Sequence, residues 1–132
     1  MKKSLLFALA LLPVSAFAQQ VDPCLSKENA QEMSACAEAR YRESEEKLAQ
    51  THAALLKQIP SKDEDGIPYK AVKRQMDKAQ SAWENFVDAD CKAIAIYNRG
   101  SALRGIEYFS CMRVHTDQRI HDLSRFVRAP KS

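Results

Sequence analysis

The chain has 132 residues, and its 20 Lys or Arg and 17 Asp or Glu residues give a formal net charge of only +3. This length suits one domain, and dispersed arginines with so little excess charge argue against a nucleic-acid partner. Only three glycines occur, and no segment alternates between apolar and polar residues as a strand does. These features predict an all-α fold.

The first eighteen residues have the three parts of a secretory signal peptide. Lys2 and Lys3 form a basic head, an apolar run follows, and small residues predict cleavage after Ala18. The apolar run is too short to cross a hydrocarbon core of about 30 Å, and no cysteine follows Ala18 to accept a lipid. We predict a signal peptide over residues 1–18 and one domain over residues 19–132, periplasmic or secreted, without a membrane anchor. Losing the two lysines lowers the formal charge to +1.

Four cysteines remain in the exported part of the chain: Cys24, Cys36, Cys91 and Cys111. An even number in an exported chain predicts two disulfides, for which three pairings are open. A four-sulfur zinc site is disfavoured, because no two cysteines have the close spacing that presents two ligands from one turn. We therefore predict neither a metal nor another cofactor.

The first predicted helix begins at Asn29, because Asn29 and Glu32 have the spacing of a capping box. It ends before Pro60, since a proline disfavours helical conformation at the preceding residue. The residues at helical spacing that form its predicted inward face are Met33, Ala37, Tyr41, Ser44, Leu48, Thr51, Leu55 and Ile59.

Residues 60–68 form a polar turn with two prolines and a glycine. A second helix is predicted from about Tyr69 to the stop at residues 98–101. Its predicted inward face comprises Val72, Met76, Ala79, Trp83, Phe86, Val87, Asp90 and Ile94.

The third predicted helix has Ile106, Phe109, Met112, Thr116, Ile120, Leu123 and Val127 on its apolar face. Short links make neighbouring helices antiparallel, so the sequence predicts an up-down-up antiparallel three-helix bundle with two disulfides. Folding at the two turns brings Cys36 and Cys111 each level with Cys91. The cysteines then gather at one end of the bundle, and Cys24 ties down the segment before the first helix.

Three blocks along the chain resemble the LprI-like family of exported proteins. They are Cys24 with the run from Gln31 to Ala37 and Tyr41, then Ala79–Phe86 with Asp88–Cys91, and finally Gly100 and Ser101 with Cys111, Thr116, Arg119 and Leu123. The family takes its name from a lysozyme inhibitor. The resemblance implies a small, helical, disulfide-bonded envelope protein that binds a lysozyme-type hydrolase.

No arrangement of side chains predicts an enzyme. His115 and His121 are six residues apart and face different sides of a helix, and we interpret them and His52 as solvated surface residues. Oxidised cysteines supply no thiol nucleophile, and no serine lies in a nucleophile motif.

Trp83, Asp90 and Arg119 are given structural roles in the predicted bundle interior. We interpret Trp83 as a core anchor rather than an exposed binding residue. Asp90 is expected to form a buried ion pair with Arg119 or Arg113.

The acidic turn is the predicted binding surface. Lys62, Asp63, Glu64 and Asp65 lie together in it, and an acidic projection complements the basic surface of animal-type lysozymes. Lys62 is placed to reach the paired carboxylates of a glycoside hydrolase. The acidic run Glu43, Glu45 and Glu46 is an alternative surface.

These observations leave three hypotheses of function. The first is an exported inhibitor of lysozyme-type peptidoglycan hydrolases, and the second is a structural or accessory periplasmic module that inhibits nothing. The third is a carrier of a small ligand, which requires an apolar cavity beside Trp83.

Overall fold

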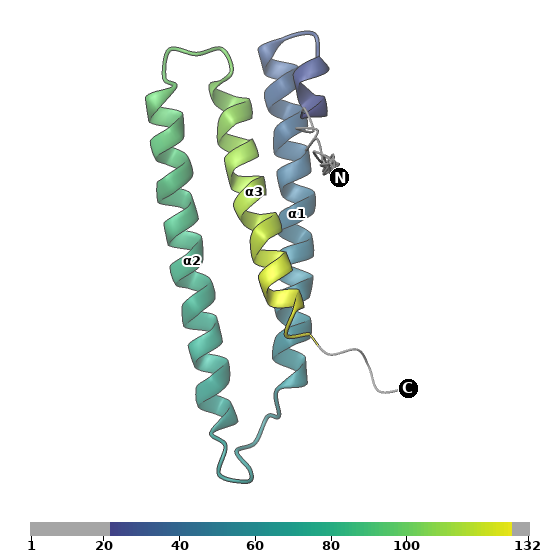
Figure 1. Cartoon of the computed structure of the whole chain (residues 1–132), viewed down its shortest axis with the longest axis vertical. Helices are drawn as coiled ribbons and strands as arrows, with labels where there is room; N and C mark the ends of the chain where they lie inside the picture. Colours follow the sequence, from purple (N-terminus) through teal and green to yellow (C-terminus); the bar gives the residue numbers. More distant parts are fainter. Residues whose placement is uncertain (1–21, 128–132) are drawn as a thin grey trace, which may run out of the picture.

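The computed structural model describes residues 22–127, and within them the chain is all-α, as predicted. A short 3-10 helix and three long helices follow one another: η1 (Pro23–Ser26), α1 (Ala30–Gln58), α2 (Tyr69–Tyr97) and α3 (Arg104–Ser124). Successive long helices are antiparallel, and α3 lies between α1 and α2 (Figure 1). The predicted signal peptide and its cleavage point lie outside the described residues.

The beginning and end of α1 are those that the sequence predicts. Asn29 caps the helix by accepting a hydrogen bond of 2.9 Å from the backbone N–H of Glu32. The return bond differs from the usual capping box, because the Glu32 carboxylate accepts from the side-chain amide of Asn29 at 3.1 Å. At the other end, Ile59 has an extended backbone conformation immediately before Pro60.

The core lies mainly between α1 and α3. Its two clusters of buried residues are Leu48, Leu55, Ile120 and Leu123 in one half of the bundle and Cys24, Ala37 and Ile106 in the other. The two helices approach closely where Gly105 faces Ser34, since a Cβ added to Gly105 would lie 2.8 Å from the Ser34 Cβ. The predicted inward residues of α1 and α3 are all buried or half-buried, although Val127 lies three residues beyond the end of α3.

The predicted inward face of α2 is partly wrong. Phe86 is 57% exposed, and Val72, Ala79 and Ile94 are also exposed. The residues that α2 buries are Gln80, Val87, Cys91 and Ala95. The physical reason is that α2 packs chiefly against α3 and hardly touches α1, so it buries a narrower and rotated stripe.

The two predicted disulfides are present, and the structure selects the pairing. Cys24 is bonded to Cys36, which fastens the segment before α1 to that helix, and Cys91 is bonded to Cys111, which links α2 to α3. All four cysteines lie toward the end of the bundle where α1 and α3 begin and α2 ends. Cys36 does not pair with Cys91, although the two were predicted to lie level.

Asp22 anchors the first described residues to two helices. Its Oδ1 accepts hydrogen bonds from the backbone N–H of Cys24 at 2.9 Å and from Arg40 at 2.8 Å. Its Oδ2 lies 3.4 Å from the hydroxyl of Ser110, which donates to it, and 3.6 Å from Arg113 of α3. Desolvation raises the pKa of Asp22, but the Cys24 hydrogen bond and the two arginine charges outweigh it, so the pKa is lowered from its usual value.

Replacing Asp22 with asparagine should lower the free energy of unfolding by about 1–2 kcal/mol at pH 7. Because the folded protein holds the pKa of Asp22 below its unfolded value, the carboxylate stabilises the fold above about pH 4 and loses this contribution as the pH falls further. Urea denaturation of both proteins at pH 7 and pH 3 should therefore show a difference that shrinks in acid. Asp88→Asn, at an exposed pair with Lys92, is the control and should change stability little.

Candidate functional site

The predicted acidic turn forms the end of the hairpin made by α1 and α2, beyond the last residue of α3 (Figure 1). The backbone N–H of Ile67 donates to the carbonyl of Glu64 at 2.9 Å. Between them, Asp65 and Gly66 have φ of +52° and +77°, the signs that a type I′ turn requires. The turn is thus a fixed structure at the tip of two long helices.

The four predicted binding residues of this turn are all exposed, but they are not equivalent. The Asp63 carboxylate accepts a hydrogen bond of 2.9 Å from the backbone N–H of Lys70 and so caps the first turn of α2. Lys62, Glu64 and Asp65 form no side-chain ion pair with any other described residue. Glu64 and Asp65 are therefore the acidic side chains of this turn that are available to a partner.

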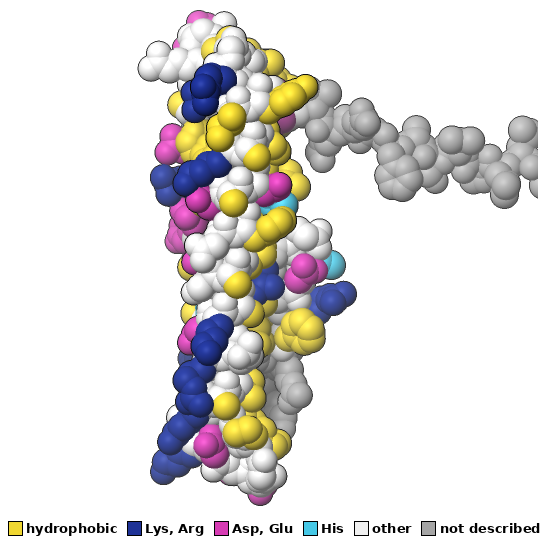
Figure 2. All heavy atoms as spheres, turned by 90° about the vertical axis from the view of Figure 1, so that its left-hand side faces the viewer, with side chains coloured by type: hydrophobic (Ala, Val, Ile, Leu, Met, Phe, Trp, Pro, Cys, Tyr) yellow, Lys and Arg dark blue, Asp and Glu magenta, His cyan; other side chains and the backbone are white. Residues whose placement is uncertain are grey.

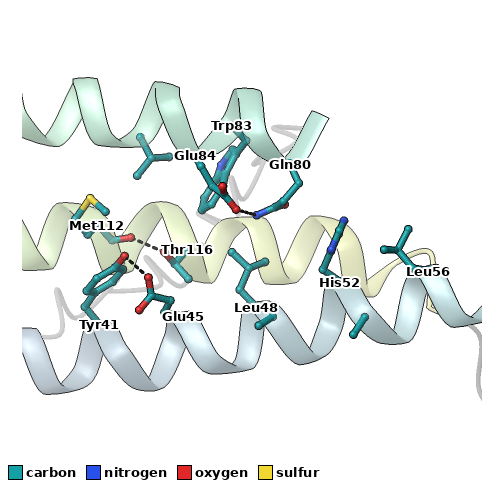
Figure 3. Close-up of a pocket in the computed structure, with 13 residues that line it drawn as sticks. Tyr41, Glu45, Leu48, His52, Leu56, Gln80, Trp83, Glu84, Met112 and Thr116 are labelled. Carbon is teal, nitrogen blue, oxygen red and sulfur yellow. Dashed lines mark hydrogen bonds between the residues drawn. The ribbon is translucent and has the colours of Figure 1, made fainter. Parts of the chain in front are cut away.

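A groove of about 550 Å³ lies between α1 and α2, because these helices hardly touch and α3 forms its floor. In Figure 3, Trp83 extends from α2 while Leu48 and His52 extend from α1 into the same space. The other lining residues are Tyr41, Glu45, Ala49, Ala53, Leu56, Gln80, Glu84, Val87, Met112 and Thr116. The cavity that the carrier hypothesis requires is therefore present beside Trp83.

The polar groups of the groove are held at its walls. The Tyr41 hydroxyl donates to Glu45 at 2.8 Å, and burial together with this hydrogen bond raises the pKa of Tyr41 to about 12. Gln80 donates to Glu84 at 3.1 Å across one turn of α2 (Figure 3). The His52 Nε2 is buried without a hydrogen-bond partner among the described residues, 3.9 Å from the nearer oxygen of Asp77.

Trp83 is neither fully buried nor fully exposed. It packs against the cluster that contains Leu48 and Leu55, and the Arg119 guanidinium lies 5.9 Å from the centre of its ring. The Arg119 Nε also donates to Gln80 at 3.2 Å. The indole therefore packs partly on the core, and it also lines the groove.

The predicted partner of Asp90 is wrong. Arg119 contacts Trp83 and Gln80, and Arg113 pairs with Asp117 and Asp22. The side chain of Asp90 is 45% exposed, and its Oδ2 lies 2.9 Å from the Nε2 of His115. The pattern on α2 could not show this, because the partner is fixed by where α3 lies.

The prediction that all three histidines are solvated surface residues is only partly correct. Only His121 is well exposed, at 70% of its side chain, whereas His52 and His115 are 18% and 29% exposed. Both half-buried rings face α2, whose position relative to the other helices could not be read from the sequence.

One cluster of potential metal ligands was missed by the sequence analysis. Asp90, Cys91, Cys111 and His115 each place a ligand atom within 4.8 Å of all the others. Cys111 and His115 are four residues apart and share one face of α3, a spacing visible in the sequence. The sequence signal of this cluster is therefore a cysteine and a histidine four residues apart, not a pair of closely spaced cysteines.

The outer side of α2 carries basic residues in its first half. Figure 2 looks onto this side and shows Lys and Arg gathered along the lower part of the molecule. Lys70, Arg74 and Lys78 are exposed at four-residue steps, and none forms an ion pair with another described residue. The basic row begins directly after the acidic turn.

These features define a small disulfide-bonded helical domain with an exposed acidic turn and an exposed basic row on α2. Residues 23–123 match the family described as "Lysozyme inhibitor LprI", and the chain belongs to this family. The predicted family resemblance is thus confirmed. The family is named for inhibition of an enzyme rather than for a reaction of its own, and it implies binding to a lysozyme-type hydrolase.

A relative with similar length is found in Rhizobium meliloti (strain 1021), where it is named only "Uncharacterized protein R02472". It is 23% identical over 133 residues, which cover 95% of this chain and 96% of the relative. No solved structure matches the chain. In the described part of the chain, no helix has both the length and the apolar character needed to span a membrane.

Proposed function

We propose that the protein is exported and inhibits a lysozyme-type peptidoglycan hydrolase by binding it and blocking its substrate cleft. Membership of the LprI family is the observation that carries this proposal. The signal peptide over residues 1–18 and the domain over residues 19–132 belong to it, and two disulfides suit an oxidising compartment. N-terminal sequencing of the exported protein should give Gln19 as its first residue.

We further propose that the acidic turn contacts the hydrolase. A projecting turn can enter a cleft, and its fixed backbone reduces the conformational entropy lost on binding. Glu64 and Asp65 would attract a basic enzyme and speed its association. Lys62 is adjacent to them and would approach the carboxylates that a glycoside hydrolase uses as acid and nucleophile.

The sharpest test replaces Glu64 with glutamine and Asp65 with asparagine in one variant. Both changes keep side-chain size, and asparagine tolerates the positive φ at residue 65. Because Asp63 is retained, the cap of α2 is kept. In a lysozyme assay on cell walls, we expect the variant to need at least about tenfold more protein for half inhibition, since two favourable charge contacts are removed.

The matched control is Glu43→Gln with Glu46→Gln, which removes the same charge from exposed positions on α1. This control should inhibit as the natural protein does. If the turn variant also inhibits normally and the α1 variant does not, the acidic run of α1 is the contact surface. If the natural protein leaves lysis unchanged at large molar excess and forms no complex, the inhibitor proposal fails.

The groove favours a second candidate function, binding of an amphiphilic small ligand. Its lining is mostly apolar, and Gln80 and Glu84 place polar groups at its wall. Trp83 is the one tryptophan of the chain, so its fluorescence reports on the groove directly. A saturable change in this fluorescence on addition of a fatty acid would support ligand binding, and an unchanged spectrum would argue against it.

A further inference from the structure

The disulfide between α2 and α3 lies within a set of side chains that suits a zinc ion. Asp90 and Cys91 are adjacent on α2, while Cys111 and His115 face them from α3. Each of the two helices thus supplies two ligands, and all four ligand atoms lie within 4.8 Å of one another. Zinc bonds of about 2.0–2.3 Å place neighbouring ligands of a tetrahedral site about 3–4 Å apart.

The imidazole is already held in this position by its neighbours. Its Nε2 lies 2.9 Å from the Asp90 Oδ2, and the Phe86 ring meets it edge to face at 5.7 Å between ring centres. The contact with Phe86 restricts the ring before an ion arrives, whereas the proton shared by Nε2 and the Asp90 carboxylate would be released when both residues bind zinc. In the disulfide form, however, neither sulfur is a thiolate, and the ligand set is incomplete.

We propose that reduction of the Cys91–Cys111 disulfide converts this cluster into a Zn²⁺ site formed by Asp90, Cys91, Cys111 and His115. The ion would then replace the disulfide as the link between α2 and α3. Two thiolates, a carboxylate and a neutral imidazole form a ligand set that zinc prefers.

The reductant is a dithiol, and the exchange balances in two steps. One thiolate of the dithiol attacks the half-buried Cys111 sulfur, because Cys91 is fully buried, and the Cys91 thiolate leaves. The second thiol of the dithiol then attacks the mixed disulfide, releases the Cys111 thiolate and leaves as an oxidised disulfide. Two electrons pass to the protein, and Zn²⁺ displaces the protons that the two cysteines would otherwise bind.

Cobalt titration of the mature chain tests the proposal, because Co²⁺ bound by thiolates in a tetrahedral site has strong visible absorption. The protein carries Cys24→Ala and Cys36→Ala, so that only Cys91 and Cys111 supply thiols. After reduction and removal of the reductant, we expect one Co²⁺ per chain with this absorption, bleached by one equivalent of Zn²⁺. The oxidised protein should give no such spectrum.

Two further variants distinguish a built site from binding by thiols alone. His115→Ala and Asp90→Ala should each weaken Co²⁺ binding by at least about tenfold, whereas His121→Ala, at an exposed histidine of the same helix, should not. If the double cysteine variant is unfolded by circular dichroism, the same comparison is made with all four cysteines present. The proposal is overturned if the reduced protein does not bind Co²⁺. It is also overturned if the His115→Ala and Asp90→Ala variants bind Co²⁺ as tightly as the protein with both residues present.

Discussion

Replacing Cys91 and Cys111 together with alanine should lower the free energy of unfolding by about 3 kcal/mol. The disulfide joins residues that are 20 positions apart, and closing a loop of this size removes conformational entropy from the unfolded chain. The loss has a particular consequence in this fold, because α2 packs chiefly on α3 and gains little support from α1. Urea denaturation followed by circular dichroism measures the change.

The comparison is Cys24→Ala with Cys36→Ala, which opens the other disulfide, of separation 12. This disulfide closes a shorter loop, so it removes slightly less conformational entropy from the unfolded chain. Opening it frees the segment before α1 and leaves the link between the two long helices intact. We expect hydrogen exchange to increase along α2 in the first variant and around residues 22–29 in the second. Equal protection of α2 with and without its disulfide would mean that packing on α3 alone holds the helix.

The boundaries of the helices could be predicted because local chemistry decides them. Asn29 and Glu32 satisfy the first backbone groups of α1, and Pro60 prevents its continuation. These effects act within a few residues of chain. They are therefore present in the sequence regardless of how the helices pack.

The buried face of α2 could not be predicted from periodicity alone. Phe86 and Ile94 lie at helical spacing with Trp83, yet both are exposed, because α2 has only one close neighbour. A helical pattern shows which residues share a face, but the number of neighbouring helices decides how much of that face is covered. The same limit hid the groove, whose walls come from two helices that make few contacts with each other.

Contacts between side chains of different helices were predicted least well. Asp90 was assigned an arginine partner from α3 and lies instead beside His115. The helix lengths and turns predicted that Cys36 and Cys111 both lie at the same height along the bundle as Cys91. They could not show which of the two is bonded to Cys91. The choice depends on rotation of each helix about its axis, which is set by packing of the whole core.

Leu55→Ala should lower the free energy of unfolding by about 3 kcal/mol, whereas Leu56→Ala should lower it by less than about 1 kcal/mol. Leu55 is 4% exposed within the cluster formed with Ile120 and Leu123, so its truncation leaves a cavity in the core. Leu56 is half-buried and lines the groove, where solvent can occupy the space that its side chain leaves.

The two leucines are adjacent in one helix, so the change in helix propensity is nearly the same for both. The difference between their denaturation midpoints therefore measures packing alone, provided that the denaturant dependence is unchanged. Equal losses would mean that α1 and α2 close over the groove in solution and cover Trp83 from both sides. Such closure would remove the space required for a ligand, so equal losses would argue against small-ligand binding. The acidic turn at the end of the same hairpin would stay exposed, so the proposed inhibition of a hydrolase would be unaffected.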